Sequence, residues 1–168
     1  LMPGVSVSLL NEKTKETQTW LYKGGLRDYL TQTLTGDPVI PLFEGEGFAD
    51  SQSDNFAEGE GAQWCVAFTE DGQPVRESYV NLIPTSAGGT HESGLRDGLF
   101  MAVKSFIELH SLLPKGVKLL PEDVFARANY VLSAKVLDPQ FQGQIKERLN
   151  SRDAVRLVSG FVRPSLEL

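Results

Sequence analysis

The chain has 168 residues, of which 40% are hydrophobic and 23% charged, so it can form one substantial hydrophobic core. Its formal net charge of −6 argues against a free-standing nucleic-acid-binding protein, because such proteins bind by neutralising phosphates. No apolar run is long enough to span a bilayer, and the amino terminus lacks the pattern of a secretory signal. The sequence therefore predicts a soluble α+β or α/β protein of the cytoplasm.

Two runs near the amino terminus, residues 4–9 and 17–22, alternate apolar and polar side chains and predict a β-hairpin. Apolar residues at helical spacing then predict a helix over residues 26–34, which Gly36 ends. Because an isolated hairpin is only marginally stable in water, we expect this one to belong to a sheet that lies largely outside the chain.

The next stretch changes from apolar to acidic. Residues 38–43 are apolar and are predicted to be extended. Residues 44–60 carry six acidic side chains, no basic ones and three glycines, which predicts a mobile, solvated loop. The acidic residues lack the spacing of a calcium-binding loop, so no metal site is predicted from Glu44, Glu46, Asp50, Asp54, Glu58 and Glu60.

Two strands are predicted over residues 62–69 and 75–83, on either side of the turn signal Asp71-Gly72. A turn of this kind favours an antiparallel hairpin, so we expect the two strands to pair with each other. Alternation within the first strand places its large apolar side chains on one face, and these are Trp64, Val66 and Phe68.

A long helix follows, with Thr90 as the expected N-cap and apolar residues at helical spacing to about Leu113. Gly94 and Gly98 lie four residues apart within it and lower its helix propensity. Such a cost usually indicates close packing against another backbone. A short helix that begins with Pro121 comes next.

The most informative polar residues lie in the loop 138–149, between a predicted strand over residues 130–137 and the last predicted helix. Gly143 allows the loop to turn sharply. Gln144 and Lys146 then provide an amide and a flexible ammonium, which suit a phosphate because it needs positive charge and hydrogen-bond donors. The alternative interpretation is a solvated loop lysine without a ligand.

Cysteine and histidine chemistry has little support. Cys65 is the only cysteine, which excludes an intrachain disulfide and a Cys-based zinc site, and its apolar neighbours predict a buried position. His91 and His110 are too few for a His-rich metal site, and no nucleophile-elbow pattern accompanies them. Because the helix dipole opposes positive charge in the first turn, we expect His91 to be a neutral, hydrogen-bonding structural residue.

The charge is unevenly distributed. Residues 127–168 hold seven Lys or Arg against four Asp or Glu, a balance of +3, which leaves −9 on residues 1–126. The carboxyl-terminal part is therefore the one expected to face a polyanion. The ends of the sequence lead us to expect a piece of a longer chain, although an expressed segment would look the same.

Three stretches in this order carry a resemblance: Tyr79-Val-Asn-Leu-Ile-Pro84, Gly88-Gly-Thr-His-Glu-Ser-Gly-Leu-Arg96 and Asp138-Pro-Gln-Phe-Gln-Gly-Gln-Ile-Lys146. The chain resembles the B subunit of bacterial type IIA topoisomerases, and topoisomerase IV more closely than gyrase. The resemblance covers essentially the whole sequence. It implies that residues 1–22 are the last hairpin of an ATPase domain and that residues 23–168 form the transducer domain that follows it.

The resemblance implies an α+β fold in which a mixed sheet has a left-handed βαβ crossover and helices packed on one face, as in transducer domains of GHKL ATPases. It also implies an ATP-operated clamp, in which a Gln-Thr-Lys loop reaches the γ-phosphate in the ATPase domain. On this reading Gln144 and Lys146 bind the nucleotide, and Lys146 stabilises charge in catalysis. Ile145 stands where the family has threonine, so this loop has no hydroxyl at that position.

The implied function of the whole subunit is ATP-dependent DNA strand passage, with decatenation of chromosomes and relaxation of supercoils. ATP and Mg²⁺ are implied for the full-length subunit and none for this piece alone, which is expected to be inactive. Implied partners are the upstream ATPase domain, a second B subunit, the topoisomerase IV A subunit and double-stranded DNA, with no membrane. The alternatives are a gyrase-type B subunit, a mismatch-repair-type clamp and a nucleotide-independent interaction module.

Overall fold

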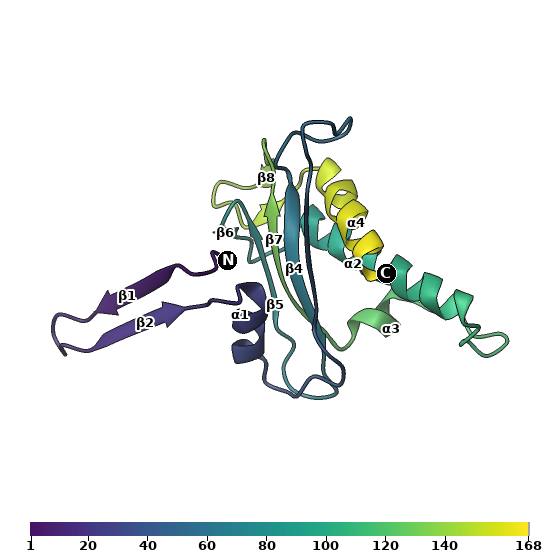
Figure 1. Ribbon diagram of the computed structural model, residues 1–168, viewed down its shortest axis with the longest axis horizontal. Helices are drawn as coiled ribbons and strands as arrows, with labels where there is room; N and C mark the ends of the chain where they lie inside the picture. Colours follow the sequence, from purple (N-terminus) through teal and green to yellow (C-terminus); the bar gives the residue numbers. More distant parts are fainter. Residues whose placement is uncertain (168) are drawn as a thin grey trace.

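The computed structural model describes residues 1–167 and shows a five-stranded sheet between helices, with a hairpin that extends away from it (Figure 1). The helices are α1 (Leu26–Thr33), α2 (Thr90–Leu109), α3 (Pro121–Phe125) and α4 (Asp153–Leu166). The strands are β1 (Ser6–Leu10), β2 (Thr17–Leu21), β3 (Phe43–Phe48), β4 (Gly61–Phe68), β5 (Arg76–Val80), β6 (Ile83–Pro84), β7 (Ala128–Lys135), β8 (Phe141–Gln142) and β9 (Arg148–Leu149). In these 167 residues no helix is both long and apolar enough to cross a membrane. The transducer domain expected over residues 23–168 therefore has one residue, the last, outside the residues that the structure describes.

The predicted amino-terminal hairpin is confirmed. β1 and β2 pair antiparallel in a sheet of their own, and all ten strand residues are exposed to solvent. In Figure 1 this hairpin points away from the body of the molecule. The hairpin therefore has no buried face within residues 1–167.

The main sheet is mixed, with the strand order β3-β4-β7-β5-β6. β7 is antiparallel to β4 and parallel to β5. A parallel pair needs a crossover connection, and α2 and α3 lie between β5 and β7 in the chain. The predicted α+β fold with a mixed sheet is therefore confirmed.

β4 and β5 do not pair with each other, so the antiparallel hairpin expected over residues 62–83 is wrong. β7 lies between them, and six of its eight residues are buried. Two polar contacts hold the start of β5 beside β7. The Asn129 side chain of β7 accepts a hydrogen bond from Val75 N at 2.8 Å. Arg76 Nη2 donates to Phe125 O, at the end of α3, at 2.6 Å. The turn signal is local, whereas these contacts join residues about 50 positions apart.

Helices cover both faces of the sheet. On one face α2 and α4 pack against the main core, which includes Trp64, Val66, Leu95, Leu99, Leu132, Leu157, Val158 and Val162. On the opposite face α1 packs through Leu26 and Leu30 on Cys65, Ala67 and Val131. α2 and α4 therefore pack on one face of the sheet as expected, and α1 forms a smaller layer on the opposite face. Figure 1 shows α1 on the hairpin side and α4 on the far side of the sheet.

The close packing predicted from Gly94 and Gly98 is confirmed, and the partner is α4. A Cβ atom at Gly94 would lie 2.6 Å from Val155 O and 2.9 Å from Val158 Cβ, and one at Gly98 would lie 3.0 Å from Val162 Cβ. Glycine is required at this crossing because the two helices approach more closely than any side chain permits.

The acidic stretch 44–60 is not a mobile loop throughout, because its first residues belong to β3. A Cβ atom at Gly45 would lie 2.6 Å from the Trp64 ring, and one at Gly47 would overlap Phe161. These glycines therefore let an edge strand run beneath large core side chains. The acidic composition concealed a strand whose inward positions are glycine rather than apolar residues.

β5 ends at Val80, earlier than expected, because Asn81 and Leu82 form a tight turn with φ values of 50° and 68°. The Asn81 side chain donates to Val136 O at 2.8 Å and accepts from Val136 N at 3.0 Å. These two side-chain hydrogen bonds replace the backbone hydrogen bonds that a further pair of residues in β5 and β7 would make. They hold the chain at Val136, two residues before the candidate loop begins at Asp138.

Candidate functional site

The loop after β7 folds back on itself as a small hairpin. Phe141 pairs with Leu149 and Gln142 with Arg148. Leu149 is buried and Phe141 packs partly into the core, so the base of this hairpin is fixed. Its tip then projects beyond the sheet, in the region labelled β8 in Figure 1.

Gln144 and Lys146 lie at this tip, and both are exposed. The turn depends on left-handed backbone conformations, with φ of 80° at Gly143 and 56° at Lys146. Ile145 between them is 74% exposed. The structure therefore presents one amide and one ammonium, two residues apart in sequence, on a support that packs into the core.

Lys146 makes no ion pair with any residue in the described part of the chain. Its Nζ atom lies 5.7 Å from the centroid of the Phe141 ring, a weak contact at an exposed position. The ammonium is thus available to an anion from outside this chain. An amide and an ammonium on one tip fit a phosphate group, which accepts hydrogen bonds and attracts positive charge.

The structure brings the Gly-Gly motif and the loop together. Ala87 N donates to Glu147 O at 2.9 Å, and Leu149 N donates to Gly88 O at 3.1 Å. Gly89 has φ of 147°, and a Cβ atom there would lie 2.6 Å from Leu149 N. The turn before α2 and the returning side of the loop, about 60 residues apart in sequence, are therefore hydrogen-bonded neighbours.

The start of α2 differs from the expectation. Gly89 is the N-cap, and Thr90 is the first helical residue, with its hydroxyl buried and without a hydrogen-bond partner among residues 1–167. The expected Thr90 N-cap is therefore wrong by one position. Gly89 takes the cap position because its unusual φ is needed where the chain passes Leu149.

His91 is the structural residue that the sequence predicts. It is fully buried, and its Nε2 atom lies 2.9 Å from Thr85 Oγ1. Thr85 Oγ1 also lies 2.9 Å from Ser78 O, so its hydroxyl links the imidazole to the backbone of β5. Burial lowers the pKa of His91 to about 4, so the ring is neutral at pH 7. This buried chain of hydrogen bonds fixes the start of α2 directly beneath the Gly-Gly turn.

The pKa of His91 predicts how stability changes with pH. Its pKa is about 4 in the folded chain and 6.5 in the reference state, so the unfolded chain binds more protons between these values. The free energy of unfolding is expected to fall by about 3 kcal/mol from this group as pH drops from 6.5 to 4. Urea unfolding of the wild type and of His91→Gln across this range measures it. Equal pH slopes in the two proteins would contradict the prediction.

Cys65 is also buried as predicted, and burial raises the pKa of its thiol to about 11. The thiol is therefore protonated at neutral pH and is a poor nucleophile. Within residues 1–167 no group of three or more His, Cys, Asp or Glu side chains could hold a metal ion.

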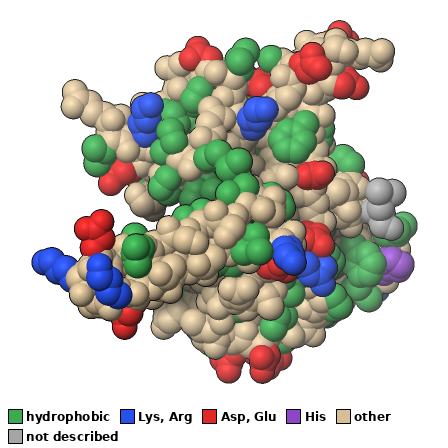
Figure 2. Space-filling view, turned by 60° about the vertical axis from the view of Figure 1, so that its left-hand side comes forward, with side chains coloured by type: hydrophobic (Ala, Val, Ile, Leu, Met, Phe, Trp, Pro, Cys, Tyr) green, Lys and Arg blue, Asp and Glu red, His purple; other side chains and the backbone are tan. Residues whose placement is uncertain are grey.

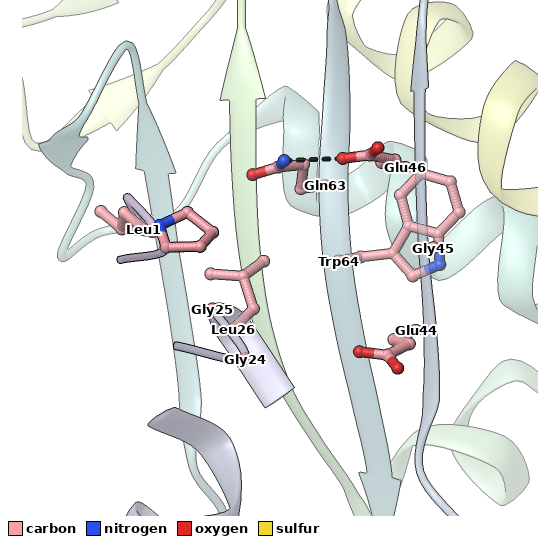
Figure 3. Close-up of a pocket in the computed structure, with 10 residues that line it drawn as sticks. Leu1, Gly24, Gly25, Leu26, Glu44, Gly45, Glu46, Gln63 and Trp64 are labelled. Atoms are coloured by element: carbon pink, nitrogen blue, oxygen red, sulfur yellow. Dashed lines mark hydrogen bonds between the residues drawn. The ribbon is translucent and has the colours of Figure 1, made fainter. Parts of the chain in front are cut away.

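Two hollows are lined by residues outside the loop 138–149. One, with a volume of about 230 Å³, lies between β3, β4 and the start of α1; in Figure 3 Gln63 and Glu46 point toward each other there, with Gln63 Nε2 2.7 Å from Glu46 Oε2. The other has a volume of about 600 Å³ and an apolar lining that includes Met2, Phe48, Leu82 and Leu137. Figure 2, with the hairpin side turned forward, shows hydrophobic side chains gathered in a hollow near its centre.

Comparison with known proteins decides the family, because the sequence pattern described as DNA gyrase B matches residues 25–168. The chain belongs to the DNA gyrase B family. It is 46% identical over 169 residues to the DNA topoisomerase 4 B subunit of Pseudomonas aeruginosa and 45% identical over 170 residues to that of Escherichia coli. Both alignments cover 100% of this chain and 26% of the relative, so the chain spans about a quarter of the length of these curated relatives.

Solved structures of the DNA gyrase B family agree with this placement. The topoisomerase IV ATP binding domain of Francisella tularensis, in complex with a small molecule inhibitor, is 37% identical, with a TM-score of 0.71 over 97% of this chain and 42% of that one. The 43K ATPase domain of Thermus thermophilus gyrase B has a TM-score of 0.80 over 98% of this chain and 43% of that one. At 20% identity the second comparison shows the fold alone.

In this DNA gyrase B family chain, sequence reasoning located the loop but missed what fixes it. Gln144 and Lys146 lie where the sequence places them, on one exposed tip. The hydrogen bonds from Ala87 and Leu149 were not predicted, because backbone contacts between distant segments leave no local pattern. The one available signal was Gly89, since consecutive glycines before a helix can indicate a close approach by another backbone.

Proposed function

We propose that this chain is the energy-coupling part of an ATP-dependent topoisomerase IV B subunit. Residues 1–22 would be the end of the ATPase domain, and residues 23–168 the transducer. Gln144 and Lys146 would contact the γ-phosphate of ATP bound by the upstream domain. The observation that carries the proposal is an exposed ammonium that makes no ion pair within residues 1–167, on a loop whose returning side is hydrogen-bonded to the turn before α2. The measurement that tests it is nucleotide turnover by the full-length subunit with Lys146→Ala.

The loop is suited to a switch because a γ-phosphate gives Lys146 a partner in one nucleotide state and none after hydrolysis. Such a difference in contacts is what a ligand needs in order to shift a conformational equilibrium. The base of the loop connects β7 to α4, and α4 packs closely on α2 through Gly94. A displacement of the tip would therefore be transmitted to the helical layer rather than absorbed locally.

ATP and Mg²⁺ would be held by the upstream domain, and Gln144 and Lys146 would add contacts to the γ-phosphate. The apolar hollow around Met2, Phe48 and Leu82 is a surface that the upstream domain would cover. A second B subunit, the A subunit and double-stranded DNA complete the proposed assembly, and its work would be decatenation and relaxation of DNA. The balance of +3 on residues 127–168 supports a face toward DNA, and binding by the assembled enzyme should weaken as salt rises.

Topoisomerase IV is preferred to gyrase because the relatives at 45% and 46% identity are topoisomerase 4 B subunits. A nucleotide-independent interaction module is the second candidate. It would leave nucleotide turnover unchanged when Lys146 is replaced, so the same experiment separates the two functions.

The 168-residue chain alone is expected to show no ATP turnover and no DNA cleavage. Its loop supplies charge stabilisation but no group that could hold the rest of the nucleotide. Phosphate release by the purified chain, compared with its Lys146→Ala variant, measures this. Turnover that depends on Lys146 in the isolated chain would show that the nucleotide site is complete without the upstream domain.

A further inference from the structure

Glu60 connects the acidic stretch to Leu137, the residue directly before the loop. Its Oε1 atom accepts a hydrogen bond from Leu137 N at 2.8 Å, and its Oε2 atom accepts one from Ala57 N at 2.9 Å. Glu60 is the residue directly before β4, and Leu137 directly precedes the Asp138-Pro139 break. One partly buried carboxylate thus holds its own segment and that of Leu137, 77 positions further along the chain.

The segment that carries Glu60 is itself fixed at several points. Ala49 N donates to Glu60 O at 2.7 Å, and Gly59 N donates to Ala49 O at 2.8 Å. The Phe56 side chain packs against the main core, and the Arg156 guanidinium of α4 lies 5.9 Å from its ring centroid. The carboxylate of Glu60 is therefore a fixed reference point between the sheet and α4.

Between Val136 and Gln140, the bond from Leu137 N to Glu60 is the one hydrogen bond that holds the chain, among the contacts of residues 1–167. Val136 is held by Asn81, and the next contact is Gln140 N, which donates to Ser151 Oγ at 2.8 Å. A hollow of about 370 Å³ beside this stretch is lined by Glu60, Leu137 and Gln140, among others. The incoming strand of the loop therefore has space to shift if the bond to Leu137 is lost.

We propose that Glu60 is a positioning residue for Lys146. It fixes the incoming side of the loop, so that the ammonium is held where it can meet the γ-phosphate. This inference rests on the proposed function, because it assigns Glu60 a role in that same contact. It also gives a purpose to an acidic stretch whose described side chains form no cluster that could hold a metal.

The test uses the full-length subunit with Glu60→Ala, Glu60→Gln and, as a matched control, Glu58→Ala. Glu58 is an exposed carboxylate two residues away that makes no side-chain hydrogen bond in the described chain. Affinity is measured for a non-hydrolysable ATP analogue and for ADP. Glu60→Ala is expected to weaken the analogue about tenfold and to leave ADP unchanged, because only the analogue offers a γ-phosphate. Glu60→Gln keeps one acceptor and should give an intermediate loss, while Glu58→Ala should give none.

A second arm combines Glu60→Ala with Lys146→Ala. If Glu60 acts through the ammonium, its effect on the analogue should disappear once the ammonium is absent. Equal losses of analogue and ADP affinity would show a merely structural role and would overturn the inference. If Lys146→Ala weakens the affinity for the analogue and Glu60→Ala does not, the inference is overturned and the proposed function remains intact. No loss on Lys146→Ala would instead refute the proposed function, and the inference with it.

Discussion

Replacing Lys146 by alanine in the full-length subunit is expected to reduce ATP turnover about 100-fold, the usual effect of removing one fixed donor to developing charge. The side chain is exposed and makes no ion pair within residues 1–167, so its loss should not unfold the protein. Affinity for ADP should be unchanged, because ADP has no γ-phosphate for the ammonium to contact. Steady-state phosphate release, ADP titration and thermal unfolding measure the three quantities.

Lys118→Ala is the matched control for this experiment. Lys118 is also an exposed lysine in a loop, but it lies beyond the far end of α2, between α2 and α3. The Lys118→Ala substitution should leave ATP turnover in the absence of DNA unchanged. Full turnover by the Lys146→Ala variant would favour the nucleotide-independent module. A collapse of thermal stability in that variant would show that the loop lysine has a structural role instead.

Gly94→Ala is expected to lower the free energy of unfolding by about 1–3 kcal/mol, although alanine is the better helix former. The added methyl would lie 2.6 Å from Val155 O and 2.9 Å from Val158 Cβ, so α2 and α4 would have to separate. Urea unfolding measures the change. In the full-length subunit the same substitution should also reduce nucleotide-dependent turnover, because α4 follows directly from the loop.

Gly160→Ala supplies the opposite expectation within the same pair of helices. Gly160 lies in α4 and is exposed, and no atom lies within 4 Å of the position that an added Cβ would occupy. The substitution should stabilise the chain by about 0.5–1 kcal/mol through helix propensity alone. Equal changes in the free energy of unfolding for Gly94→Ala and Gly160→Ala would contradict the account. They would mean that the contact between α2 and α4 does not decide whether the added methyl group stabilises or destabilises the chain.

The elements that sequence patterns predicted well are those with a strong local signal. The alternation in residues 4–9 and 17–22, the apolar spacing of α2 and the strand at residues 130–137 correspond to β1, β2, α2 and β7, with ends shifted by a few residues. The candidate loop was recognisable because proline, glycine and an isolated lysine follow one another at the end of a strand. His91 was interpretable because a helix start and burial both disfavour its charge.

The features that were missed depend on distant partners. The Asp71-Gly72 turn favours a hairpin of β4 and β5, but β7 lies between these two strands and binds the start of β5 through Asn129. β3 escaped detection because Gly45 occupies an inward position that is filled by the Trp64 ring of β4. Glu60 looked like one more solvated carboxylate, and only the folded chain shows that it lies beside Leu137.

The position of the Lys146 ammonium in a nucleotide-bound subunit is the most direct test of the proposed coupling. A structure of the longer protein with a non-hydrolysable ATP analogue should place Lys146 Nζ about 3 Å from an oxygen of the γ-phosphate, with Gln144 beside it. A bound triphosphate with the ammonium still in solvent, or paired elsewhere in the protein, would contradict the account.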